Sequence, residues 1–282
     1  MSSNQWENKS VLITGICGTI GLELLKQLIN KNCKRIIGID NNESEIFLVS
    51  QKYKNHKNIE IILCDINNKD MVFNISEEID IFIHTAALKN VDVCEKSPTE
   101  AISTNIQGLN NVLNAAESNN ISKFIFTSSD KAANPTNVMG TTKLLGEKLV
   151  SAKNFNLFQR KKTQYFSTRF GNVLGSAGSV IPVFINQVQN GGPITLTDNK
   201  MTRFIMSIEQ SAKMVLDSVW LAKGGEVLVT KMPVIKIIDL AYAIIEIFKE
   251  KNPKLKEIKI KHIGKKQGEK LYEELLTEDE AS

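Results

Sequence analysis

The stretch VLITGICGTIG at residues 11–21, with RIIGID at residues 35–40, decides the fold of this chain. Apolar runs at 11–15 and 35–40 predict two buried strands, and residues 18–31 between them predict a helix. The same alternation continues along the chain, with further strands predicted at 59–65, 79–85 and 123–129. Runs of Ile, Val and Phe that alternate with helices indicate an α/β fold with a doubly wound parallel sheet.

The pattern changes after about residue 170. Residues 170–184 are rich in small side chains and predict a loop that enters a helix. The elements expected after it are short strands near 194–197 and 226–229 and helices at 207–222 and 235–250. We therefore expect a Rossmann core over residues 1–170. Residues 171–282 should form mainly a smaller substrate-binding lobe, within one integrated unit.

Three glycines, Gly15, Gly18 and Gly21, lie where the first strand turns into the first helix. Because they have no side chains, backbone N–H groups can approach a pyrophosphate, whose negative charge the helix N-terminus favours. The spacing is G-x-x-G-x-x-G, not the G-x-G-x-x-G of simple dehydrogenases. We expect this loop, with Thr19 and Ile20, to bind a dinucleotide.

Two aspartates end the next two predicted strands. Asp40 is placed to bind the adenosine ribose hydroxyls, and its charge would repel a 2′-phosphate. Asn41 and Asn42 follow it instead of an arginine, so NAD is favoured and NADP is the alternative. Asp65, with the following Ile66, suits the adenine edge. The structural alternatives are a helix N-cap for Asp40 and a turn for Asp65.

Composition argues against several classes of function. The 282 residues carry a formal net charge of +4, almost all the cations are lysines, and no basic stripe is interleaved with aromatics, so no nucleic-acid partner is predicted. The four cysteines form no C-x-x-C pair and the three histidines match no ligand spacing. We expect reduced cysteines in or near the core, and no metal. No apolar run approaches the ~20 residues of a membrane helix and no signal-peptide core precedes the first strand, so we expect a cytoplasmic protein with no membrane partner.

The block TSSDKAANP at 127–135, followed by MGTTK at 139–143, spans the end of one strand and the start of the next helix. Here the chain resembles the extended short-chain dehydrogenases/reductases, whose active site faces a Tyr-x-x-x-Lys on that helix. More narrowly, it resembles the UDP-N-acetylglucosamine 4,6-dehydratases of bacterial capsule, flagellin and surface-glycan pathways. The resemblance covers the whole chain and includes HTAALKNVDVCE (84–95), TNIQG (104–108), RFGNVLGSAGSVIP (169–182), ITLTDNKMTRF (194–204) and GEKLYEELL (268–276).

The resemblance implies a reaction on UDP-N-acetylglucosamine with no net redox change. A hydride leaves C4 for the tightly held dinucleotide, and the proton at C5 becomes removable. A base takes that proton, an acid expels the C6 hydroxyl as water, and the hydride returns to C6. In the Asp-Lys pair the chain resembles the members of the family that invert C5. The expected product is therefore UDP-2-acetamido-2,6-dideoxy-L-arabino-hex-4-ulose. Epimerisation at C3 is left open, and we expect a homo-oligomer, a hexamer or a dimer.

The catalytic positions follow from the same motif. Asp130 is expected to be the general acid at C6 and Lys131 the base at C5, each with a pKa tuned by partial burial in a closed site. Ser129 would hydrogen-bond the C4 oxygen. Lys143 would hold the nicotinamide ribose and lower the pKa of the group that ionises at C4.

Met139 departs from the pattern of the superfamily. Ordinary members carry a tyrosine there as the C4 base, and a thioether cannot take a proton. Some capsule-type dehydratases that this chain resembles also carry methionine, so the change is compatible with activity. The C4 base is left open between Lys143, directly or through water, and Asp130. A core methionine beside an inactive site is the alternative.

The resemblance also assigns positions around the two ligands. Arginine is scarce in this chain, and the guanidinium groups of Arg203 and Arg169 are available to bind the diphosphate. Asn105 is expected to be structural, supporting the catalytic lysine through water. The cofactor side adds Ala86 and Ala87, and the remaining substrate-side positions are Lys89, Asn172, Ser179, Val180, Thr195, Thr197 and Glu269.

Two rival functions are left open. A UDP-hexose 4-epimerase would share the fold, the cofactor and the sugar nucleotide, but it needs a proton relay at position 139 and no base for C5. Met139 and Lys131 both argue against it. A catalytically inactive dinucleotide sensor would keep the glycine loop and lose the catalytic helix, whereas Lys143 and Asp130 are present.

Overall fold

The structure is a computed structural model that describes residues 5–155, 163–176, 178–265 and 268–281. Within these residues, one parallel sheet of seven strands has the order β10-β6-β5-β4-β1-β2-β3. Its strands, in chain order, are β1 (Ser10–Thr14), β2 (Arg35–Asp40), β3 (Ile59–Leu63), β4 (Ile81–His84), β5 (Lys123–Ser129), β6 (Gln164–Phe170) and β10 (Val227–Val229). The α/β fold class with a doubly wound parallel sheet is therefore confirmed.

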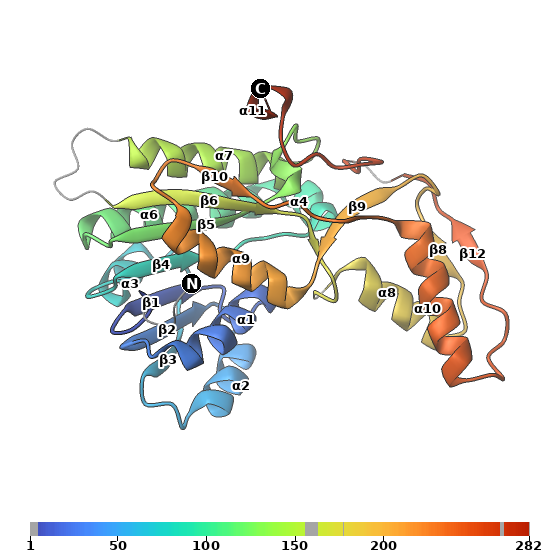
Figure 1. Cartoon of the computed structure of the whole chain (residues 1–282), viewed down its shortest axis with the longest axis horizontal. Helices are drawn as coiled ribbons and strands as arrows, with labels where there is room; N and C mark the ends of the chain where they lie inside the picture. The colour runs from blue at the N-terminus through green and yellow to red at the C-terminus, as the bar shows by residue number, and fades with distance from the viewer. Residues whose placement is uncertain (1–4, 156–162, 177, 266–267, 282) are drawn as a thin grey trace.

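Helices cover both faces of this sheet (Figure 1). The alternation along β1 sets the two faces, because Val11 and Ile13 belong to one apolar cluster and Leu12, between them, to the other. On the first face pack α1 (Thr19–Leu28), α2 (Glu43–Tyr53) and α9 (Ile208–Leu221). On the second face pack α3 (Lys69–Ile75), α6 (Leu109–Ser118) and α7 (Val138–Asn154).

A smaller lobe lies beyond one end of the sheet (Figure 1). Its apolar cluster joins α8 (Val180–Gln189) and α10 (Ile237–Lys251) to the paired strands β8 (Ile194–Leu196) and β12 (Ile260–His262). A three-stranded sheet of β7 (Asn172–Val173), β9 (Thr202–Met206) and β11 (Val234–Lys236) leads to it. Between these elements the chain returns to the large sheet, because α9 packs on α1 and β10 pairs with β6.

Residues 268–281 cross back over the large sheet and end at α11 (Glu278–Ala281), which lies beside α7 (Figure 1). We call residues 268–281 the C-terminal strap. The backbone N–H of Thr202 donates to the Leu271 carbonyl, and Arg169 donates to the Leu275 carbonyl. The strap is therefore tied to both the smaller lobe and the core.

Two further sequence-based expectations meet the structure. The four cysteines are free, with Cys33, Cys64 and Cys94 buried and Cys17 half-buried, as expected. Across the described ranges, no helix combines the length and apolar character that crossing a bilayer requires. Strands β6, β7, β9, β11 and β12 were not predicted from the sequence.

Candidate functional site

A cavity of about 730 Å³ opens at the carboxyl ends of the parallel strands. Asp40 and Ser129 end β2 and β5, and Gly15 and Thr85 directly follow β1 and β4. This edge is where open α/β sheets bind ligands. The residues predicted to contact the cofactor or the substrate line the cavity, except Gly21, Asp130 and Arg169. The lining includes both the core and the smaller lobe.

The glycine turn has the shape that the sequence predicted. Gly15 has φ +68°, and a Cβ there would lie 2.7 Å from the Ala86 nitrogen. A Cβ on Gly21 would lie 2.3 Å from the Gly15 carbonyl oxygen, so this glycine serves the packing of α1 and not the cavity wall. Gly18 is the N-cap of α1 and does line the cavity. Backbone N–H groups at the start of α1 are thus open to an anion, which fits the pyrophosphate of a dinucleotide.

Thr14 and His84 support the opposite side of this turn. Thr14 Oγ1 accepts hydrogen bonds from the backbone nitrogens of Thr85 and Ala86, each at 3.2 Å, and lies 2.7 Å from His84 Nδ1. Because both N–H groups donate to Thr14 Oγ1, its own hydrogen is left to donate to His84. Burial, and then the charge of Lys143, lowers the pKa of His84 to about 3, which agrees with a neutral ring. The predicted cofactor residues Ala86 and Ala87 follow this buried anchor.

The two aspartates both face the cavity. Asp40 accepts from the backbone nitrogens of Cys17 and Asn42, each at 3.1 Å, and the N-cap of α2 is Asn42 rather than Asp40. Each carboxylate oxygen has further lone pairs for ribose hydroxyls. Asp65 Oδ1 accepts from Asn67 at 2.8 Å, so it forms a turn while it also lines the cavity.

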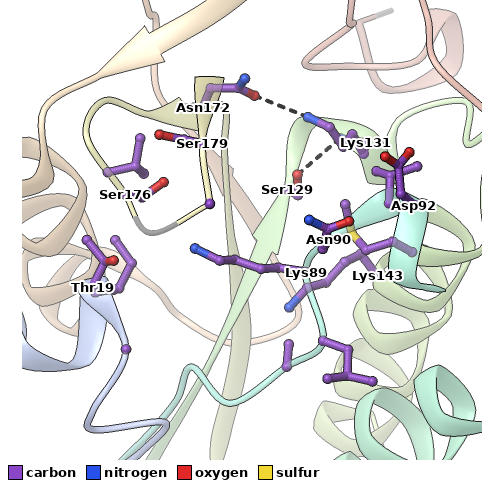
Figure 2. Close-up of a pocket in the computed structure, with 18 of the residues that line it drawn as sticks. Thr19, Lys89, Asn90, Asp92, Ser129, Lys131, Lys143, Asn172, Ser176 and Ser179 are labelled. Atoms are coloured by element: carbon purple, nitrogen blue, oxygen red, sulfur yellow. Dashed lines mark hydrogen bonds between the residues drawn. The ribbon is translucent and has the colours of Figure 1, made fainter. Parts of the chain in front are cut away.

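Ser129, Asp130 and Lys131 form one connected cluster. Asp130 Oδ1 accepts from Ser129 Oγ at 2.9 Å and from Lys131 Nζ at 3.0 Å. Lys131 also donates to Asn172 Oδ1 at 3.2 Å (Figure 2). Asp130 is fully buried, and its Oδ2 has no hydrogen-bond partner within the described part of the chain. Ser129 and Lys131 therefore form the cavity wall, and the carboxylate lies behind them.

Lys143 and Met139 lie on α7 at the base of the cavity. Lys143 Nζ donates to the Thr127 carbonyl at 2.8 Å and lies 4.7 Å from the centre of the Phe126 ring. Burial lowers the pKa of Lys143 to about 8. Met139 is 3% exposed and packs with Cys94 and Ala101 at a position that lines the cavity.

Asn105 connects the loop that follows β4 to helix α7. It lies in a π-helical turn, Ser103–Gly108, of the kind often found at functional sites. Its side chain bonds both backbone groups of Leu88 and donates to Thr142 Oγ1 at 2.9 Å. These contacts fix the neighbours of Lys89 and Lys143, so the protein contacts of Asn105 are structural. Burial lowers the pKa of Lys89, which points into the cavity (Figure 2).

The smaller lobe supplies the far wall of the cavity. Ser179 is the N-cap of α8, and its buried Oγ has no hydrogen-bond partner among the residues that the structure covers. Val180 begins that helix. The Gln187 side chain makes two hydrogen bonds to Thr195: Nε2 donates to Thr195 Oγ1 at 2.7 Å, and Oε1 accepts from the Thr195 backbone nitrogen at 3.0 Å. The cavity is also lined by the predicted substrate-side residues Thr197, Arg203, on β9, and Glu269, on the C-terminal strap.

Arg169 does not bind a diphosphate, contrary to the prediction. It is fully buried, and its Nε and Nη2 donate to the two carboxylate oxygens of Glu147 at 3.0 and 2.6 Å. Its Nη1 donates to Glu280 at 2.8 Å and to the Leu275 carbonyl, also at 2.8 Å. The donors of the guanidinium are therefore occupied by groups of the protein, and two of these groups belong to the C-terminal strap. Arg203, by contrast, reaches the cavity.

Three further cavity residues were missed in the sequence. Asn90 and Asp92 line the cavity, and Asp92 lies near Lys131 (Figure 2). Glu273, on the C-terminal strap, is 8% exposed and lies near both Lys131 and Arg203. Glu273 lies in the stretch GEKLYEELL, in which the residue predicted to bind the substrate was Glu269.

Comparisons with known proteins identify relatives along nearly the whole chain. The profile of a family described as polysaccharide biosynthesis protein matches residues 11–282. A protein of Methanocaldococcus jannaschii named "Uncharacterized membrane protein" is 45% identical over 99% of this chain and 83% of its own length. The capsular polysaccharide biosynthesis protein CapD of Staphylococcus aureus is 40% identical over 99% of this chain, which spans only 47% of CapD.

A relative named UDP-glucose 4-epimerase, from Rickettsia bellii, is 39% identical over 97% of this chain and 79% of its own length. The X-ray structure of Pen from Bacillus thuringiensis aligns with a TM-score of 0.93 and 41% identity, covering 98% of this chain and 84% of that one. These matches agree with the parallel sheet and with the glycine turn at its edge. The chain belongs to the polysaccharide biosynthesis protein family.

Proposed function

We propose that the protein is a UDP-N-acetylglucosamine 4,6-dehydratase that also inverts C5, with NAD as its cofactor. The observation that carries the proposal is the hydrogen-bonded pair of Asp130 and Lys131, 3.0 Å apart, at the end of β5. Elimination of water across C5 and C6 needs a base and an acid side by side. Moving one proton from Lys131 Nζ to Asp130 Oδ1 yields an amine and a carboxylic acid, the two forms that the elimination requires.

Ser129 gives the buried acid access to the substrate. Asp130 itself does not line the cavity, but Ser129 Oγ donates to its Oδ1 at 2.9 Å and does line it. We assign Lys131 to the C5 proton, and Ser129 to passing a proton from Asp130 to the departing C6 hydroxyl. The same hydroxyl is placed to bind the C4 oxygen earlier in the reaction.

Lys143 is the base that we assign to the C4 hydroxyl. Met139 leaves no hydroxyl where the superfamily carries its tyrosine, whereas an amine with a pKa of about 8 is partly neutral near neutrality. The cofactor, when bound, supplies a hydride acceptor for C4 and a hydride donor for C6. The chain holds it through Gly15, Gly18 and Asp40, and the carboxylate of Asp40 disfavours the 2′-phosphate of NADP.

The diphosphate of the sugar nucleotide is assigned to Arg203 and to the start of α8. The helix dipole favours an anion at that end, and the Ser179 hydroxyl is left to donate. Thr195, Thr197 and Glu269 are assigned to the uridine. The scarce guanidinium of Arg203 suits this role because its planar donors match phosphate oxygens.

A 4-epimerase is the second candidate, because a relative 39% identical carries the name UDP-glucose 4-epimerase. Epimerisation removes and returns a hydride at C4 and needs no chemistry at C5. The Asp130–Lys131 pair has no role in such a reaction, and for this reason we rank it second. The two functions give different products from the same substrate.

Proton NMR of the purified protein with NAD and UDP-N-acetylglucosamine in D2O, without added reductant, tests the proposal. We expect a 6-methyl signal with deuterium at C5, and ring coupling constants that report inversion. Lys131→Met is the matched control, and it should leave C5 protonated. Formation of UDP-N-acetylgalactosamine instead would establish the epimerase, and an unchanged substrate would overturn the dehydratase for this sugar.

A further inference from the structure

Glu273 brings a second carboxylate to Lys131. Its Oε1 lies 3.7 Å from Lys131 Nζ and 4.0 Å from Arg203 Nε, so one oxygen faces two cations. The side chain of Glu273 is 4% exposed, and those of Lys131 and Arg203 are 17% and 8% exposed. Charges this well buried are little screened by solvent, so their interactions are stronger than on an open surface.

Glu273 and Asp130 flank Lys131 in the same way. Each gives one oxygen to the ammonium group, and the second oxygen of each, Glu273 Oε2 and Asp130 Oδ2, is buried with no hydrogen-bond partner in the described ranges. A buried carboxylate oxygen without a donor costs free energy. Such groups persist at sites that a ligand completes.

The position of Glu273 is fixed by anchors on both sides along the strap. Before it, the Gly268 carbonyl accepts from Thr136 Oγ1 and Asn137 Nδ2, each at 3.0 Å. After it, the Leu275 carbonyl accepts from the buried Arg169 at 2.8 Å. The carboxylate is therefore held against the cavity by the fold and not by Lys131 and Arg203 alone.

We propose that Glu273 is a positioning residue that couples diphosphate binding to the catalytic lysine, an inference that rests on the proposed function. In the ligand-free site its carboxylate restrains both Arg203 and Lys131. An incoming diphosphate competes with Glu273 for Arg203. Once the diphosphate is bound, the Glu273 carboxylate interacts with Lys131 alone. Lys131 is thereby held between Asp130, Asn172 and Glu273 when the sugar is in place.

This role has opposite consequences for nucleotide binding and for turnover. Removing the charge of Glu273 frees Arg203 and takes away a carboxylate that repels the diphosphate, so the nucleotide should bind more tightly. The same change removes one of the two carboxylate charges that hold Lys131 in place, so proton transfer at C5 should slow. A residue with a merely structural role would weaken both properties together.

Glu273→Gln tests the proposal, with Glu274→Gln as its matched control. Glu274 is the next residue, its side chain is 43% exposed, and it accepts from Asn134 outside the cavity. We expect Glu273→Gln to bind UDP about threefold to tenfold more tightly in calorimetric titration, and to lower kcat with UDP-N-acetylglucosamine about tenfold or more. Glu274→Gln should leave both values as in the wild type.

The outcomes separate this inference from the proposed function. Tighter UDP binding by Glu273→Gln supports the inference, even if the wild type leaves UDP-N-acetylglucosamine unchanged and the dehydratase proposal falls. Binding that is unchanged or weaker overturns the inference, even if the wild type is a dehydratase. A wild type that does not bind UDP overturns both. If Glu273→Gln does not fold, Glu273→Asp, which keeps the charge but draws it back, should shift both values in the same directions by less.

Discussion

At the scale of single residues, the chemistry that we propose at C4 can be tested at Met139 and Lys143. The Met139 side chain packs against Cys94 and Ala101, and a thioether moves no proton. We expect Met139→Leu, which keeps nearly the same volume, to hold kcat within about twofold of the wild type. A coupled turnover assay at fixed NAD measures this.

The pH profile tests Lys143 itself. An amine acts as a base only when neutral, and burial lowers the pKa of Lys143 to about 8, so kcat/KM should fall as the pH drops below about 8. Lys143→Met should abolish turnover while Met139→Leu keeps the wild-type profile. A rate that stays level between pH 6 and 8 would assign the C4 base to Asp130 instead.

Single residues also show what the sequence could and could not predict. Gly15, Asp40 and Lys131 belong to local motifs at strand ends and Lys143 to a motif on the next helix, so the sequence located them. Arg169 and Arg203 look alike in sequence, and only the buried partners of Arg169 separate the internal guanidinium from the one in the cavity. Glu273 could not be chosen over its neighbours, because its place depends on how the strap crosses the core.

At the scale of elements, two glycines in the turn between β1 and α1 have different roles: Gly18 faces the cavity, and Gly21 allows the helix to pack against the turn. Gly18 lines the cavity and a Cβ there would meet only the Gly15 oxygen, at 3.2 Å, whereas a Cβ on Gly21 would lie 2.3 Å from that oxygen. We expect Gly18→Ala to change the free energy of unfolding by less than about 1 kcal/mol and to weaken NAD binding by about tenfold or more. Gly21→Ala should cost about 3 kcal/mol of stability.

Urea unfolding and a titration with NADH followed by its fluorescence distinguish the two glycine variants. The comparison carries its own control, because each variant adds one methyl group to the same turn. Wild-type NADH affinity in Gly18→Ala would mean that this helix N-terminus is not the pyrophosphate site.

The first five strands of the large sheet were predicted from their long apolar runs, which β6 lacks. β6 was missed because QYFSTRF carries Ser167, Thr168 and Arg169, which are fully buried in the structure. Arg169 can be buried there because Glu147 and Glu280, distant in sequence, neutralise its charge. The short strands β7, β9, β11 and β12 were missed because two to five residues carry little periodicity, and each contains a charged residue, a histidine or an asparagine, which the predicted short strands β8 and β10 lack.

At the scale of the whole molecule, Arg169 connects the core sheet to the C-terminal strap. We expect Arg169→Lys to lower the free energy of unfolding by about 3 kcal/mol, because lysine keeps the charge but cannot bond both oxygens of Glu147 and also reach Glu280. Glu280→Gln, at the side chain that is 34% exposed, should cost less than about 1 kcal/mol. Chemical denaturation of the two variants measures both, and equal losses would contradict this division.

The order of the cavity residues along the chain has a consequence for synthesis. Those assigned to the dinucleotide lie between Gly15 and Lys143, while Glu269 and Glu273 leave the ribosome after every other described residue that lines the cavity. A nascent chain can therefore assemble the dinucleotide half before its reaction chamber is complete. On these assignments, a polypeptide released before Glu269 keeps every residue assigned to the dinucleotide and lacks the last two residues of the cavity.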